Sequence, residues 1–166
     1  EVFIMNENNG RRIGAIVFVC ILAIAVAAMV FPIGVYYNKA LSGTTEYYDG
    51  IKCVFGGQSL PGGRGDLVSG FNVGTFLGFV FPLIGALVYV VCGGFLKKGW
   101  GIIAPIACFL TSFILLFCSV TFFAATNGRD PNQYNIGVGP VVGAIIGICG
   151  FIFSGIVGIR TAVASK

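Results

Sequence analysis

The sequence contains no histidine, and only 10% of its residues are charged. Without histidine and without a Cys-x-x-Cys pair it offers no recognisable zinc or haem site, so we expect no metal and no cofactor. Soluble domains carry about 25% charged residues, and a chain with so few cannot cover a water-exposed globule. The sequence therefore predicts an integral membrane protein. No polar stretch is long enough for a second domain, so residues 1–166 are expected to form one transmembrane domain.

Charge is also absent from the interior of every long apolar segment. Ion-coupled transporters, proton relays and voltage sensors need ionisable groups at membrane depth, so this absence argues against those classes. The serines have no histidine to act as their base, and we expect no enzyme activity. The Lys and Arg residues are scattered singly and in pairs, without the basic cluster that nucleic-acid binding needs.

Four long apolar segments are present, and they predict an all-α fold, a bundle of four transmembrane helices. The expected spans are about 13–37, 67–96, 100–125 and 136–162, and the expected outer loops are 38–66 and 126–135. The first span has a rival interpretation, a secretory signal with Arg11 and Arg12 as its basic region and Ala25-Val26-Ala27 as its cleavage motif. We favour a retained span, because apolar residues continue beyond that motif.

The second segment is the longest of the four. At about 1.5 Å per residue, residues 67–96 make a helix of roughly 45 Å, which exceeds a bilayer core of about 30 Å. Such a helix has to tilt, kink at Pro82 or project beyond the membrane. Asp66 is expected to cap its first turn, and Lys97 and Lys98 are expected to end it.

The basic residues favour an orientation with both termini in the cytoplasm. The inner side then carries Arg11, Arg12, Lys97, Lys98, Arg160 and Lys166, and the outer side carries Lys39, Lys52, Arg64 and Arg129. This excess of inner cations follows the positive-inside rule, and the outer cations are accompanied by acidic residues. We therefore expect a multi-pass protein whose loops 38–66 and 126–135 face outward.

The first outer loop combines turn residues with a β-prone piece. Asp49-Gly50 is a tight-turn signal, and we expect a short β-hairpin in which Thr44–Tyr48 pairs with Ile51–Phe55. Cys53 has no second cysteine in this loop, which argues against a disulfide there. The candidate contact residues for a partner are Tyr47, Tyr48, Phe55, Arg64 and Asp66. Arg64-Gly65-Asp66 matches the tripeptide that integrins read, although a flexible turn explains it more simply.

Glycine gives the strongest positive signal. Rows with a spacing of four residues occur in the second and the fourth segment, namely Gly70, Gly74 and Gly78, and Gly139, Gly143 and Gly147. At that spacing the glycines form a smooth ridge that lets another helix approach closely. Two interpretations stay open: packing within this chain's own bundle, and contact between protomers.

A larger first outer loop, a tiny inner turn and a short second outer loop resemble the topology of claudin-like and MARVEL-type four-span proteins. Claudins carry Trp…Gly-Leu-Trp…Cys…Cys in the first outer loop. This chain has Gly50-Ile51-Lys52-Cys53 there, without the tryptophans or the second cysteine. The resemblance therefore covers topology alone, and no functional residue is carried over.

Together these features predict a non-enzymatic membrane protein that acts by association, as a homo-oligomer or as an accessory or structural subunit of a membrane complex. Its expected partners are the lipid bilayer and other membrane proteins or copies of itself. The alternative is a small channel or carrier for neutral solutes, formed by the bundle or by its oligomer, because glycine also lines narrow pores.

Overall fold

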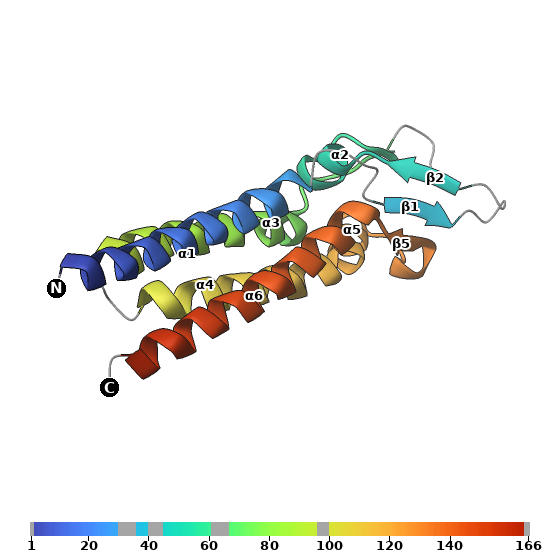
Figure 1. Ribbon diagram of the computed structural model, residues 1–166. Helices are drawn as coiled ribbons and strands as arrows, with labels where there is room; N and C mark the ends of the chain where they lie inside the picture. Colours follow the sequence, from blue (N-terminus) through green and yellow to red (C-terminus); the bar gives the residue numbers. More distant parts are fainter. Residues whose placement is uncertain (1, 30–35, 40–44, 61–66, 96–99, 165–166) are drawn as a thin grey trace.

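The computed structural model describes residues 2–29, 36–39, 45–60, 67–95 and 100–164. The helices are α1 (Val2–Ala28), α2 (Gly50–Phe55), α3 (Val73–Val88), the π-helix η1 (Tyr89–Phe95), α4 (Trp100–Phe117), α5 (Ser119–Thr126), the 3-10 helix η2 (Pro131–Gln133) and α6 (Val138–Ala164). The strands are β1 (Tyr36–Lys39), β2 (Thr45–Tyr48), β3 (Ser59–Leu60), β4 (Leu67–Val68) and β5 (Tyr134–Ile136). The long helices lie side by side in alternating directions, with the strands at one end and both chain termini at the other (Figure 1).

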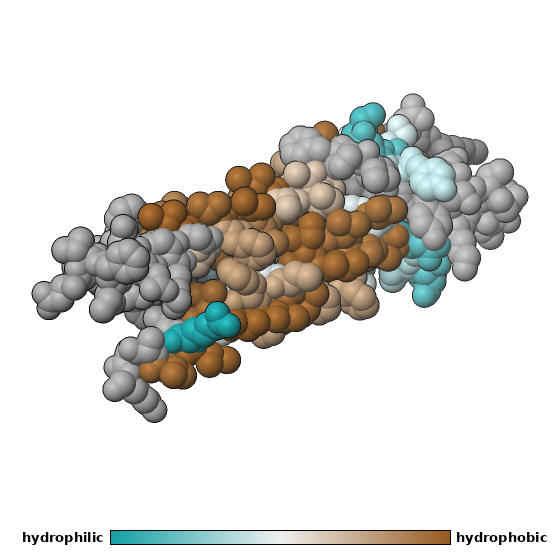
Figure 2. All heavy atoms as spheres, viewed as in Figure 1, coloured by the Kyte–Doolittle hydropathy of each residue, from teal (hydrophilic) through white to brown (hydrophobic). Residues whose placement is uncertain are grey.

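The helical body is apolar enough to suit a membrane. Among the described residues, two helices are long and apolar enough to cross one, Val73–Cys92 and Val138–Arg160. A third joins them if α4 and α5, which meet at a bend of 60°, count as a single span. Hydrophobic residues cover most of the visible side of the helical body (Figure 2). A mostly helical fold that includes helices long and apolar enough to cross a membrane is therefore confirmed.

The first predicted span, 13–37, is wrong at its end. Helix α1 stops at Ala28, and Tyr36–Lys39 forms strand β1 instead of continuing the helix. The physical reason is that β1 has a strand on either side, β2 and β5, whose backbone groups satisfy its own. The apolar part of α1 among the described residues, Ala15–Ala28, is shorter than a full span.

The second predicted span, 67–96, begins too early. Leu67–Val68 is strand β4, which pairs antiparallel with Ser59–Leu60. Helix α3 starts at Val73, after the N-cap residue Asn72. Because these residues form a strand, the helix is shorter than expected. The difference between its length and the thickness of a bilayer core is therefore smaller than the sequence predicts.

Three further predictions concern the course and the ends of this helix. Pro82 lies inside α3, which continues to Val88 and is followed directly by η1. The expected cap, Asp66, lies outside the described residues, and Asn72 holds the capping position instead. Lys97 and Lys98, the expected end of the span, also lie outside the described residues.

The core of the bundle is a ring of four helices in which α4 packs between α3 and α6, and α1 packs against both of them from the other side. Two clusters of buried side chains fill it, one that includes Val26, Phe79 and Leu116 and one that includes Val19, Ala86 and Phe109. Each cluster draws residues from at least three helices, so the helices are held together along their length by apolar packing.

Candidate interaction site in the head of the bundle

The strands and short helices at one end of the bundle form a unit that we call the head: β1, β2, α2, β3, β4, α5, η2 and β5 (Figure 1). Strand β1 is the centre of a three-stranded antiparallel sheet with the order β2-β1-β5. In its register Tyr36 lies opposite both Tyr48 and Ile136, and Asn38 lies opposite Tyr134. The segments that the sequence predicts as two separate outer loops are therefore joined by strand pairing.

The hairpin predicted between Thr44–Tyr48 and Ile51–Phe55 is wrong in its pairing. Strand β2 pairs with β1, and Ile51–Phe55 belongs to helix α2. The reason lies in Asp49, whose carboxylate accepts hydrogen bonds from the amides of Ile51 at 2.8 Å and Lys52 at 3.2 Å. Asp49 therefore acts as an N-cap that starts a helix, and the Asp-Gly pair does not form a hairpin turn.

Polar groups fasten α2 to the chain that leads into α3. The Ser69 hydroxyl donates to the Lys52 carbonyl at 3.1 Å, and its oxygen accepts from the Gln58 amide at 3.0 Å. The Asn72 amide donates to the Val54 carbonyl at 2.8 Å. Because Ser69 and Asn72 each donate a hydrogen bond to a backbone carbonyl of α2, this helix is held in a fixed position beside the first turn of α3.

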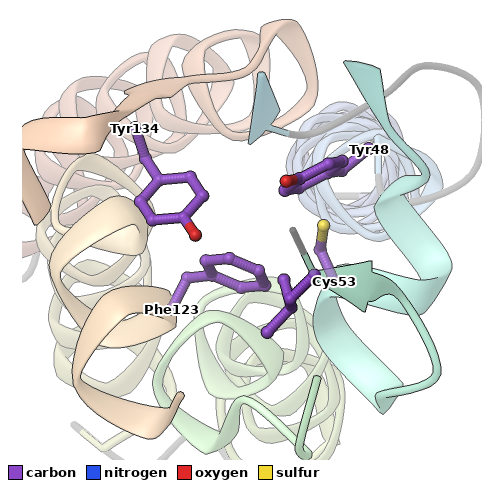
Figure 3. Close-up of a cluster of buried hydrophobic side chains, with 5 residues drawn as sticks. Tyr48, Cys53, Phe123 and Tyr134 are labelled. Carbon is purple, nitrogen blue, oxygen red and sulfur yellow. The ribbon is translucent and has the colours of Figure 1, made fainter. Parts of the chain in front are cut away.

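An aromatic cluster forms the core of the head. Its members are Tyr48 from β2, Cys53 from α2, Leu60 from β3, Phe123 from α5 and Tyr134 from β5. Their side chains converge from different elements, as Figure 3 shows for the four that it labels. The Phe123 ring lies 5.5 Å from that of Tyr134 in an edge-to-face arrangement and 6.3 Å from that of Tyr48. Aromatic pairs at such distances stabilise a core beyond their buried area.

Two ionisable groups of this cluster, Cys53 and Tyr134, are held in their neutral forms. Burial raises the pKa of the Cys53 thiol far above its ordinary range, and the carboxylate of Asp49 raises it further. Burial also raises the pKa of Tyr134; the Arg129 cation opposes this shift and Cys53 adds to it. A nucleophilic cysteine needs a lowered pKa and access to solvent. Cys53 has neither, so it is a packing residue.

The candidate contact residues differ in their exposure to solvent. Tyr47 is 75% exposed and Phe55 is 52% exposed, so both lie at the surface of the head. Tyr48 is buried in the aromatic cluster and is not available to a partner. Arg64 and Asp66 lie outside the described residues. Tyr47 and Phe55 are therefore the two candidates that the structure places where a partner can reach them.

The glycines of the second segment face α4 and α5. A Cβ at Gly74 would overlap the ring of Phe122, and one at Gly78 would lie 2.8 Å from Leu116 Cδ2. Gly70 precedes α3, and a Cβ there would lie 3.4 Å from Thr126 Cγ2. Gly74 and Gly78 therefore provide the close approach of neighbouring elements within this chain.

The glycines of the fourth segment face the same neighbour. A Cβ at Gly143 would lie 2.9 Å from Leu116 Cδ1, and one at Gly147 would lie 3.4 Å from the Phe113 amide nitrogen, both on α4. Gly139 is buried near the start of α6. Gly78 and Gly143 thus contact the two methyl groups of one α4 side chain, Leu116, and a Cβ at Gly143 would also lie 3.3 Å from Phe79 Cε1 on α3.

The structure also has a surface groove that sequence reasoning missed, because it is assembled from three separate segments. It has a volume of about 320 Å³ and is lined by Leu60, Val68, Gly70, Thr126, Asn127 and Arg129. The Asn127 side chain accepts from the Gly70 amide at 2.9 Å and donates to the Phe123 carbonyl at 2.7 Å. The Thr126 hydroxyl donates to the Phe122 carbonyl at 2.8 Å. The Asn127 side chain therefore links the end of α5 to the chain before α3, whereas the bond of Thr126 lies within α5.

The interior of the helical body is closely filled where the structure describes it. A cavity between α1, η1, α4 and α6, lined in part by Val19, Pro105 and Ser154, has a volume of about 10 Å³. That is room for about one water molecule. Within the described ranges, no group of three or more His, Cys, Asp and Glu side chains could hold a metal ion.

Comparison with protein-family models, with curated proteins and with solved structures finds no match for this chain.

Proposed function

We propose that the chain is a four-span integral membrane protein with both termini on the cytoplasmic side. The spans are α1, α3 with η1, α4 with α5, and α6. Helix α1 packs into the bundle through Val19, Ala23 and Val26, while its other side exposes Ile21 and Ile24. Apolar residues on both sides suit a helix that lies between a bundle and lipid. The sequence also remains apolar from Ala28 to residue 35, which gives this span the length it needs.

We further propose that the protein is not an enzyme and acts by association, through its head, with another membrane protein or with a second copy of itself. The observation that carries this proposal is the contrast between the two parts of the molecule. The helical body is closely filled, whereas the head is a unit with its own aromatic core, built from both outer segments. A rigid surface of this kind can bind a partner without a large loss of conformational entropy.

The contact surface that we propose is centred on Tyr47. This residue lies on β2, an edge strand of the sheet, and is 75% exposed. Tyrosine is enriched at the centres of protein interfaces, because it combines a large apolar area with a polar tip and few rotatable bonds. The glycine rows take no part in this contact, since Gly74, Gly78, Gly143 and Gly147 are already covered by neighbours in the same chain.

Site-specific photo-crosslinking in native membranes tests the proposal. A photoreactive phenylalanine analogue at Tyr47 is expected to give a discrete adduct, either with a second protein or with twice the mass of the chain. The matched control carries the same analogue at Gln133, which is also exposed but lies in η2, on the β5 side of the sheet. The control is expected to give no adduct of that mass.

Two results would contradict the association proposal. One is a particle of one chain mass in lipid nanodiscs together with no adduct at Tyr47 in native membranes. The other is permeation of glycerol or urea into proteoliposomes at a rate that scales with protein content. The second result would favour a channel or carrier for neutral solutes over an association role.

A further inference from the structure

Three phenylalanines form an exposed patch on the side of the head where α2 meets α3. Phe55 ends α2, Phe71 lies in the connection before α3, and Phe76 lies in the first turns of α3. Their ring centroids are separated by 6.2 Å (Phe55 to Phe71), 5.7 Å (Phe55 to Phe76) and 5.3 Å (Phe71 to Phe76). Phe55 is 52% exposed and Phe71 45% exposed, so this aromatic patch has one side packed and one side open.

The aromatic patch continues an apolar stripe along α3. Phe76 belongs to a row with alternating spacings of three and four residues, which keeps one face of a helix: Val73, Phe76, Val80, Leu83 and Leu87. Val73, Leu83 and Leu87 in this row are exposed, and Phe76 and Val80 are half-buried. Since Leu83 and Leu87 lie well inside the candidate span Val73–Cys92, this face of α3 is the one that lipid covers if α3 crosses a membrane.

Polar contacts hold the patch in place at the end of that span. The Asn72 amide, between Phe71 and Val73, donates to the Val54 carbonyl next to Phe55 at 2.8 Å. Gly56 directly follows Phe55 with φ +93°, and a Cβ there would lie 2.9 Å from the Ser69 carbonyl oxygen. A left-handed backbone in such close contact needs glycine. The turn after Phe55 is therefore fixed close to the chain before Phe71.

We propose that the aromatic patch is a lipid-binding surface, which seats the head in the interfacial region of the outer leaflet beside α3. On the apolar face of a segment that lies in the membrane interface, phenylalanine side chains are buried at the boundary between the headgroups and the acyl chains. The exposed residues Ile51 and Lys52 on α2 add an apolar side chain and a cation that suits a lipid phosphate. The patch is the direct continuation of a lipid-facing stripe, which favours lipid over a protein as its occupant. This inference rests on the proposed membrane span of α3.

Fluorescence quenching by brominated lipids tests the depth of the patch. The chain has a single tryptophan, Trp100, and Trp100→Phe provides a background without tryptophan. In phosphatidylcholine vesicles, Phe71→Trp in this background is expected to be quenched more strongly by lipids brominated near the glycerol than by those brominated deep in the acyl chains. It is also expected to show a blue-shifted emission maximum. Phe55→Trp serves as an independent second reporter if Phe71→Trp does not fold.

Two further tryptophan variants distinguish failure of the lipid-binding surface from failure of the proposed span. Tyr47→Trp, in the exposed part of the head, is expected to remain unquenched, and Leu87→Trp, inside α3, is expected to be quenched by deeply brominated lipids. Quenching at position 87 but not at positions 71 and 55 overturns the lipid-binding surface and leaves the span intact. It would make the aromatic patch a protein-docking surface. Loss of quenching at position 87 overturns the span itself, and with it the proposed membrane function.

Discussion

The hydroxyl of Ser112 on α4 donates a buried hydrogen bond of 2.6 Å to the carbonyl of Gly78 on α3. In a regular helix that carbonyl would accept from the amide four residues later, but this residue is Pro82, which has no amide hydrogen. Gly78 has no side chain, and so α4 can approach the exposed carbonyl. A neighbouring helix thus replaces the hydrogen bond that the proline removes, and α3 continues past Pro82 to Val88.

Replacement of Ser112 by alanine is expected to destabilise the protein by about 1 to 2 kcal/mol, because the Gly78 carbonyl loses its donor in an apolar interior. In a Pro82→Ala background the same replacement is expected to cost less, since the new amide at position 82 can donate to Gly78. Unfolding in mixed detergent micelles measures both effects. Equal costs in the two backgrounds would show that Ser112 and Pro82 act independently.

The glycines of α6 differ in how much space surrounds them. A Cβ at Gly150 would overlap the ring of Phe109, which is fully buried and cannot move aside, whereas a Cβ at Gly155 would meet no atom within 4 Å. Gly150→Ala is therefore expected to cost about 1 to 3 kcal/mol from overpacking. Gly155→Ala is expected to be neutral or to stabilise by up to about 1 kcal/mol, because alanine has the higher helix propensity. Thermal melts in detergent provide the comparison, and an equal loss in both variants would contradict the packing around α4.

Asn72 is a fully buried N-cap. Its side-chain oxygen accepts from the Thr75 amide at 3.1 Å. Asn72→Ala is expected to destabilise the protein by about 1 kcal/mol or more, and Asn72→Ser is expected to recover most of the loss because serine caps helices well. Hydrogen exchange localises the effect: faster exchange at Thr75 and Phe76 is expected for Asn72→Ala. Unchanged exchange there would indicate that the first turn of α3 is held by packing alone.

The sequence predicts the helical body well, because a long apolar run without charge has few other stable states. The ends of the helices are harder to predict from the sequence. Tyr36 and Tyr37 continue an apolar run and read as the end of a helix, whereas they belong to strand β1. Its partner Tyr134–Ile136 lies almost a hundred residues later, and local pattern carries no information on such pairing. The prediction that Leu67–Val68 begins a helix is wrong for the same reason, because these residues pair with Ser59–Leu60.

The head illustrates a second limit. Asp-Gly signals both a hairpin turn and a helix start, and Asp49 takes the second role because the amides of Ile51 and Lys52 lie within its reach. For Asn72 a signal did exist, since an asparagine directly before an apolar run is a typical N-cap. The patch formed by Phe55 and Phe71 could not be predicted, because it depends on where α2 sits beside α3.

Stability is expected to fall at alkaline pH through Cys53. Burial raises the pKa of this thiol in the folded protein above its ordinary value of 9.0. Its contribution to stability is therefore fully present below about pH 9 and is lost as the pH rises further, because the unfolded chain then releases a proton that the folded chain keeps. Tyr134, whose pKa is also raised by burial, adds a loss of the same sign above its ordinary value of 10.0.

Chemical denaturation at pH 8 and pH 10.5 measures this loss, and Cys53→Ala is the control. The variant is expected to be less stable at pH 8 and to lose less stability between the two values. A parallel decline in the variant and in the parent chain would assign the pH dependence to other groups. Near-ultraviolet circular dichroism, which reports on the packing of Tyr48 and Tyr134, shows whether the head is the part that opens.

The central position of β1 also sets an order of events during synthesis. Tyr36 emerges early, yet its pairing with Ile136 cannot form until α3, α4 and α5 have been made and laid down beside α1. One edge of β1 therefore remains unpaired through most of translation. During that time it can pair with any other strand. The sheet is complete only when β5 has been made, after α3, α4 and α5, so a closed head is a sign that these three helices have been made.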